Sequence, residues 1–63
     1  MCEANAYMDK GGKEELILEG VDIIKPEDGK LFLKNIFGEQ KILGSKIKYI
    51  SLIEHKIILE EVK

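Results

Sequence analysis

The sequence predicts an all-β protein: a small, mostly antiparallel barrel of about six short strands that forms a homodimer. Short apolar segments alternate with turn residues about every ten positions, which is typical of β-sandwiches and barrels. Apolar residues do not keep the helical period over any long stretch, so no helix is expected. Several segments are apolar on both faces, although the chain is too short to provide a second layer.

The turn residues predict the order of the strands. Gly11-Gly12 predicts a hairpin turn after a first strand over 2–9. Gly20 predicts a bend or bulge between strands over 14–19 and 21–25. The stretch from Pro26 to Gly29 has the composition of a turn. The remaining expected elements are strands over 30–35, 41–43, 45–53 and 56–62, a corner over 36–40 and a two-residue turn at Glu54-His55.

The length of 63 residues predicts one domain over 1–63 and a need for extra stabilisation. A chain of this size buries only about 60% of its unfolded surface. Small domains compensate with disulfides, structural metals or oligomerisation. The chain has one cysteine and one histidine, so it can form neither an internal disulfide nor a closed zinc site of its own. Association of two copies is the remedy that remains.

The segments that are apolar on both faces indicate where a second copy would dock. One face of each would fill the barrel, and we expect the partner to cover residues such as Ile17, Phe32 and Ile58. Ordinary exposed apolar side chains are the simpler alternative.

The strand over 45–53 supports the same expectation. Lys46 and Lys48 alternate in phase with Ile50 and Leu52, so one face changes from charged to apolar along the strand. A strand that leaves solvent and passes under a partner would show this pattern.

No enzyme is predicted. His55 stands in a turn between charged residues and is interpreted as solvated, and no nucleophile, base and orienting group are grouped in the sequence. The start shows no signal-peptide pattern, and the longest apolar runs are three residues, so we expect a cytoplasmic protein without a membrane span.

An RNA-binding small β-barrel is the alternative function. Lys34, Lys46 and Lys48 could contact phosphates, with Tyr7 or Tyr49 as a stacking surface. The net charge of −2 and the absence of arginine argue against this class, because arginine is the preferred residue for phosphate and base contacts. Nucleic acid is therefore not the expected partner.

The single cysteine, Cys2, directly follows Met1. It alternates in phase with Ala4, Ala6 and Met8, and could be a small core residue. If Met1 is removed, however, the α-amine and thiol of Cys2 can both lose a proton to a metal and chelate it. Two copies would supply an N₂S₂ set, which suits Ni(II) or copper. The residues alone leave both interpretations open.

The start MCEANAY, the stretch EELILEGVDIIKPEDGKLFLKNIFGEQK and the tail IKYISLIEHKIILE resemble the CooT-type nickel-binding proteins. The most specific parts are residues 1–3 and 37–41, and the resemblance spans essentially the whole chain. It implies a small β-barrel homodimer that assists maturation of carbon monoxide dehydrogenase as a metallochaperone or nickel store. It also implies one Ni(II) per homodimer, bound between protomers, with Cys2 as the metal residue. The implied partners are a nickel-enzyme apoprotein or its maturation factors.

Overall fold

The computed structural model describes residues 3–61 as a six-stranded sheet in which every regular element is a strand. The prediction of an all-β fold of about six strands is therefore confirmed. The strands are β1 (Ala4–Lys10), β2 (Lys13–Glu27), β3 (Lys30–Asn35), β4 (Gln40–Leu43), β5 (Ser45–Ser51) and β6 (Lys56–Glu61). These residues contain no helix long and apolar enough to span a membrane.

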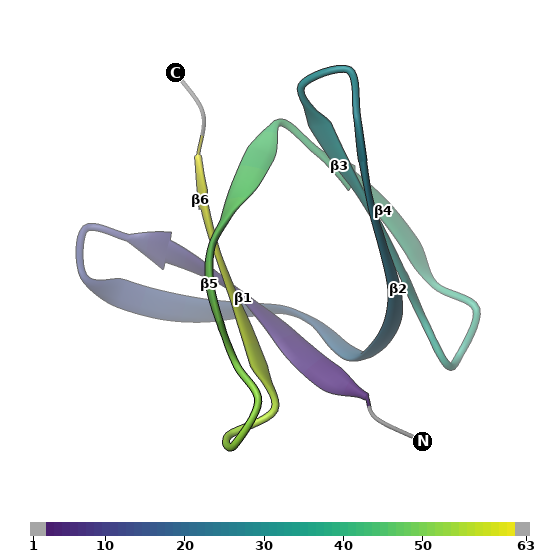
Figure 1. Ribbon diagram of the computed structural model, residues 1–63, viewed down its shortest axis with the longest axis horizontal. Helices are drawn as coiled ribbons and strands as arrows, with labels where there is room; N and C mark the ends of the chain where they lie inside the picture. The colour runs from purple at the N-terminus through teal and green to yellow at the C-terminus, as the bar shows by residue number, and fades with distance from the viewer. Residues whose placement is uncertain (1–2, 62–63) are drawn as a thin grey trace.

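The sheet has the order β4-β3-β2-β1-β6-β5 and is barrel-like but open. All neighbouring strands are antiparallel except β1 and β6, which run parallel. The edge strands β4 and β5 follow one another through Gly44 without pairing, and the sheet curls so that β3 contacts β5 (Figure 1). The prediction of a small curved β-sheet is thus correct. The sheet is not a closed barrel, because its edge strands β4 and β5 are not hydrogen-bonded to each other. The homodimer stays a prediction.

Strand β2 is one fifteen-residue strand, where the sequence predicts two. Gly20 adopts φ +68° at the predicted bend, and the pairing of β1 with β2 shifts register next to it. The Gly20 N–H donates to the side-chain oxygen of Asn5 at 3.1 Å, which satisfies the backbone group that the irregularity leaves unpaired. A bulge therefore bends the strand without ending it.

The predicted turn over 26–29 is shorter than expected. Pro26 lies inside β2 opposite Leu31 of β3, and only Asp28 and Gly29 form the turn. Their φ values of +45° and +76° are those of a type I′ hairpin, in which both central residues adopt the left-handed conformation.

The core is made by one face of the curled sheet. The buried apolar residues of this face are Ala6, Met8, Leu18, Val21, Leu31, Leu33, Ile57 and Leu59. The prediction that Ala6 and Met8 share an inward face with Ala4 is confirmed, since Ala4 packs against this core. Ile17 and Phe32 are half-buried.

The expectation that Ile58 needs cover from a second copy is wrong. Ile58 is only 1% exposed within one chain, because β6 lies between β1 and β5. Tyr7 of β1 and Tyr49 of β5 are its register partners on either side, and directly paired residues share one face of a sheet. The two tyrosines therefore flank Ile58 on the outer face.

The predicted phase of β5 is also wrong, because the pairing with β6 has a register shift between Ile47 and Tyr49. Lys46 pairs with Glu60, whereas Ile50 pairs with Ile57, a core residue. At this shift β5 has one more residue than β6. The additional residue moves Ile50 to the face opposite that of Lys46, toward the interior of the curled sheet.

Asn35 holds the corner between β3 and β4. Its buried side-chain amide donates to the carbonyl oxygen of Glu19 at 3.0 Å and to Oε1 of Glu39 at 2.8 Å. Its Oδ1 accepts from the N–H groups of Phe37 at 3.1 Å and Glu39 at 2.8 Å. Because all four positions of the amide are used, the corner is bound to the bulge of β2 rather than being a free loop.

Candidate functional site

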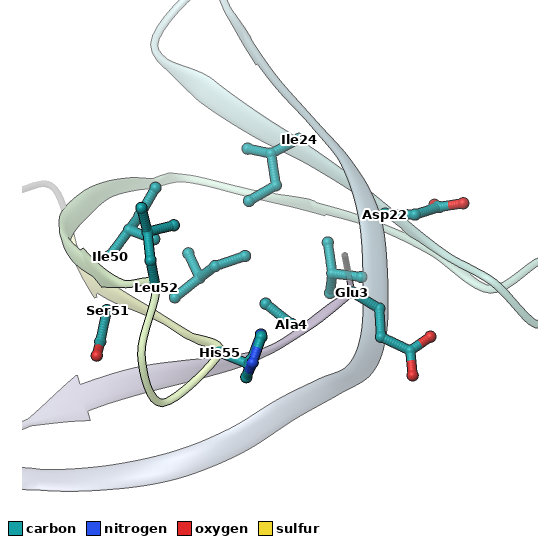
Figure 2. Close-up of a pocket in the computed structure, with 10 residues that line it drawn as sticks. Glu3, Ala4, Asp22, Ile24, Ile50, Ser51, Leu52 and His55 are labelled. Atoms are coloured by element: carbon teal, nitrogen blue, oxygen red, sulfur yellow. The ribbon is translucent and has the colours of Figure 1, made fainter. Parts of the chain in front are cut away.

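A pocket of about 420 Å³ lies beside the start of β1, at one end of the curled sheet (Figure 2). Its lining comes from four strands, from the β5–β6 turn and from Glu3, which precedes β1. The residues are Glu3, Ala4, Val21, Asp22, Ile24, Ile50, Ser51, Leu52, His55 and Ile57.

The β5–β6 turn forms one wall of this pocket. The carbonyl oxygen of His55 accepts a 3.0 Å hydrogen bond from the N–H of Asn5, and the Ser51 hydroxyl accepts one of 3.2 Å from the N–H of Glu54. His55 adopts φ +56°, a left-handed conformation that closes the turn. The prediction that His55 is an exposed turn residue is confirmed, and its ring also lines the pocket.

The pocket has an apolar interior and charged groups at its rim. Figure 2 shows Ile24, Ile50 and Leu52 around the space, while the carboxylates of Glu3 and Asp22 point away from these side chains. A molecule that covered the apolar part would therefore not have to bury those two charges.

The predicted metal residue, Cys2, lies outside the described residues. Glu3, the next residue along the chain, lines the pocket. Across residues 3–61, no group of three or more His, Cys, Asp or Glu side chains lies close enough together to hold a metal ion. The nickel prediction therefore depends on Cys2.

The lysines of β5, which the RNA-binding alternative requires, pair with acids. Lys48 forms an ion pair with Asp9, and Lys46 lies 4.0 Å from Glu60. The hydrogen bond from Lys48 lowers the pKa of Asp9, and the same bond raises the pKa of Lys48. Both groups stay charged at neutral pH, so the Lys48 charge is already compensated within the chain.

The two tyrosines proposed as stacking surfaces also have partners in the chain. The ammonium of Lys56 lies 5.4 Å from the centroid of the Tyr7 ring, within cation–π distance. The hydroxyl of Tyr49 donates to Glu14 at 3.3 Å. Loss of hydration, and then the Glu14 carboxylate, raise the pKa of this hydroxyl, which stays protonated. The structure gives no support to the RNA-binding alternative.

Comparison with known proteins identifies the family. The sequence model of the CooT family, described as CO dehydrogenase accessory protein CooT, matches residues 1–60. The chain belongs to the CooT family. A crystal structure of a candidate CooT from Carboxydothermus hydrogenoformans is 47% identical, with a TM-score of 0.93 over 98% of this chain and 100% of that one. The uncharacterised protein MJ1551 of Methanocaldococcus jannaschii is 35% identical over 60 residues, which are 95% of this chain and 98% of the relative.

Family membership confirms the resemblance drawn from the sequence and makes this CooT chain a CO dehydrogenase accessory protein. The sequence did not reveal the pocket. Its residues come from separate strands, and the bulge in β5 that turns Ile50 toward it depends on pairing with β6. The one available signal was the apolar character of Ile50 and Leu52 at the end of a strand that begins with lysines.

Proposed function

We propose that this CooT chain binds Ni(II) as a cargo ion between two copies of itself and stores it or passes it to CO dehydrogenase during maturation. The observation that carries the proposal is a single cysteine at position 2 in a chain of the CooT family. The role is that of an accessory protein rather than an enzyme.

The proposed donors are the Cys2 thiolate and, after removal of Met1, the Cys2 amine. A thiol and an α-amine have ordinary pKa values of about 8.5 and about 8, so a metal ion can displace both protons at neutral pH. One chain supplies two donors, and a two-fold dimer supplies four. The resulting sulfur and nitrogen set suits Ni(II), with one ion per homodimer.

The position of Glu3 supports this proposal. Glu3 and Ala4 lie at the pocket, beside the β5–β6 turn. Two copies that met at this end would each bring the residue before Glu3 to the same region, because consecutive Cα atoms are about 3.8 Å apart. The proposed place of action is the cytoplasm, where a free thiol remains reduced.

A nickel titration of protein with a native N-terminus tests the proposal. Intact mass first establishes that Met1 has been removed. We expect thiolate-to-nickel absorption to saturate at one Ni(II) per two chains for the wild type, and to be lost in Cys2→Ser. His55→Gly is the matched control, because it removes the histidine ring at the pocket and leaves Cys2 in place.

Equal nickel binding by the wild type and Cys2→Ser would refute the role of Cys2. Saturation at one Ni(II) per chain would refute the shared site while leaving Cys2 as a ligand. Loss of binding in His55→Gly with an intact fold would show that the imidazole belongs to the donor set.

A further inference from the structure

The outer face of β2, β3 and β4 carries lysines and apolar side chains next to one another. Leu31 and Leu33 of β3 belong to the core, so Phe32 between them lies on the opposite, outer face. Directly paired residues share a face, and Phe32 has Lys25 of β2 and Ile42 of β4 as its partners. One row across these three strands is therefore basic, aromatic and aliphatic in turn.

The neighbouring row places its lysine on the middle strand. Lys34 of β3 pairs with Ile23 of β2 and Gln40 of β4, and Lys30 lies on the same face of β3, nearer the β2–β3 hairpin. Ile42 is 67% exposed and Ile23 36%. The face lies at the right of Figure 1, apart from the β5–β6 turn. We define the lysine face as Ile23, Lys25, Lys30, Phe32, Lys34 and Ile42.

The lysines of this face differ in their pairing from those of β5 and β6, which all form ion pairs with carboxylates of the same chain. Among residues 3–61, Lys25, Lys30 and Lys34 form no such pair. Lysines on an edge strand prevent pairing between sheets, which accounts for Lys41 of β4. Strands β2 and β3 are interior strands, so protection of an edge does not account for Lys25 and Lys34.

A groove of about 350 Å³ crosses the hairpin end of the lysine face and is lined by Glu27, Asp28, Lys30, Phe32 and Ile42. Glu27 and Asp28 would repel a nucleic acid, which carries a charge at every phosphate. Phe32 is half-buried between its two strand partners and is poorly placed for base stacking. An acidic protein surface can instead place separate carboxylates at the lysines and apolar side chains over Phe32 and Ile42.

We propose that the lysine face docks this accessory protein on CO dehydrogenase, by contact with an acidic and apolar patch of the apoenzyme. The inference rests on the proposed delivery of Ni(II) and assigns the surface that recognises the recipient. Obligate interfaces are the more hydrophobic class, so a face that alternates lysines with apolar side chains suits a contact that is released after delivery. None of the six side chains lines the pocket beside Glu3, so docking leaves that end of the sheet uncovered.

Biolayer interferometry of the purified full-length protein against purified apo-CO dehydrogenase of the same organism, over a series of salt concentrations, tests the proposal. The variants are Lys25→Glu and Ile42→Asn. The control is Lys13→Glu, which makes the same charge change at an exposed lysine of β2 outside the lysine face. Circular dichroism and thermal denaturation establish that each variant keeps its fold, which we expect because none of the three residues belongs to the core.

We expect the wild type and Lys13→Glu to bind the apoenzyme with the same dissociation constant, which rises with salt because the charges are screened. Lys25→Glu should raise this constant about tenfold or more at low salt, because the new carboxylate would face acidic groups of the partner. The effect of Lys25→Glu should shrink at high salt, whereas Ile42→Asn should weaken binding at every salt concentration because it removes an apolar contact.

Absence of binding by the wild type, equal binding by all the variants, or equal weakening in Lys13→Glu and Lys25→Glu would overturn the proposal. Two further results would overturn it by assigning the face to another occupant. These are dissociation of a wild-type dimer by Ile42→Asn in analytical ultracentrifugation, and binding of a single-stranded RNA oligonucleotide that Lys25→Glu abolishes. Equal nickel binding by the wild type and Cys2→Ser refutes the nickel proposal alone, and wild-type affinity of Cys2→Ser for the apoenzyme supports the docking surface.

Discussion

The backbone N–H of Asn5 donates a 3.0 Å hydrogen bond to the carbonyl oxygen of His55. This bond joins the start of β1 to the β5–β6 turn, although the two residues are fifty positions apart in the sequence. It places Glu3 and Ala4 beside the β5–β6 turn, where both residues line the pocket. This bond therefore links two segments, distant in the sequence, that line the same side of the pocket.

Substitutions at His55 test whether the β5–β6 turn requires a residue with a left-handed backbone conformation. Its φ of +56° is accessible to glycine but strained for a β-branched residue. We expect His55→Val to lower the free energy of unfolding by about 1–2 kcal/mol, which corresponds to roughly 4–16 °C in melting temperature for a domain of this size. His55→Gly should unfold close to the wild-type temperature. Thermal denaturation followed by circular dichroism measures both. A His55→Val variant as stable as the wild type would contradict the requirement for a left-handed residue.

Alanine substitutions at Gly20 and Gly44 test whether the bulge in β2 requires glycine, because only Gly20 lies at the bulge and has a positive φ. Gly20 has φ +68°, and an added Cβ would lie 3.2 Å from Cγ1 of Ile36. We expect Gly20→Ala to cost about 1–2 kcal/mol of stability. Gly44 does not have a positive φ, and an added Cβ would meet nothing within 4 Å. Gly44→Ala should therefore either leave stability unchanged or raise it by about 0.4–1 kcal/mol, because alanine lowers the conformational entropy of the unfolded chain.

Urea denaturation of the two alanine variants and the wild type measures this difference. Equal midpoints for Gly20→Ala and Gly44→Ala would show that the bulge tolerates an ordinary side chain.

The ion pair between Asp9 and Lys48 predicts a pH dependence of stability. The hydrogen bond from Lys48 lowers the pKa of Asp9 from 3.8, so its contribution is present above that value and is lost as the pH falls through the folded-state pKa. The same bond raises the pKa of Lys48 from 10.5, so its contribution is present below that value and is lost at higher pH. The pair is exposed, so the effect should be small and should weaken with salt.

Asp9→Asn isolates this contribution, because asparagine keeps the side-chain oxygen that accepts the 3.0 Å bond from the Gly12 N–H. We expect the wild type to be more stable than Asp9→Asn at pH 7 and the difference to vanish in acid. Melting temperatures of the two proteins measured from pH 7 down to pH 2 check this. A constant difference across that range would mean that the ion pair does not contribute.

Most turns and strands could be predicted from residues that are close together in the sequence. Gly11-Gly12 is the predicted hairpin turn, Gly20 is the predicted bulge, and Lys30–Asn35 is a strand with the predicted bounds. These predictions succeed because positive φ and alternating polarity act within a few residues. The role of Cys2 stays a prediction, since this residue lies outside the described part of the chain.

The sequence by itself determined the all-β class, an approximate number of strands, the position of most turns and the family to which the chain belongs. Only the tertiary structure decided which apolar residues remain exposed. Ile58 is buried because strands distant in sequence place tyrosines beside it, and Ile50 faces the pocket because a bulge forms where β5 pairs with β6. Strand register arises between segments far apart in the chain, and a shift of one residue reverses the face that every later side chain occupies.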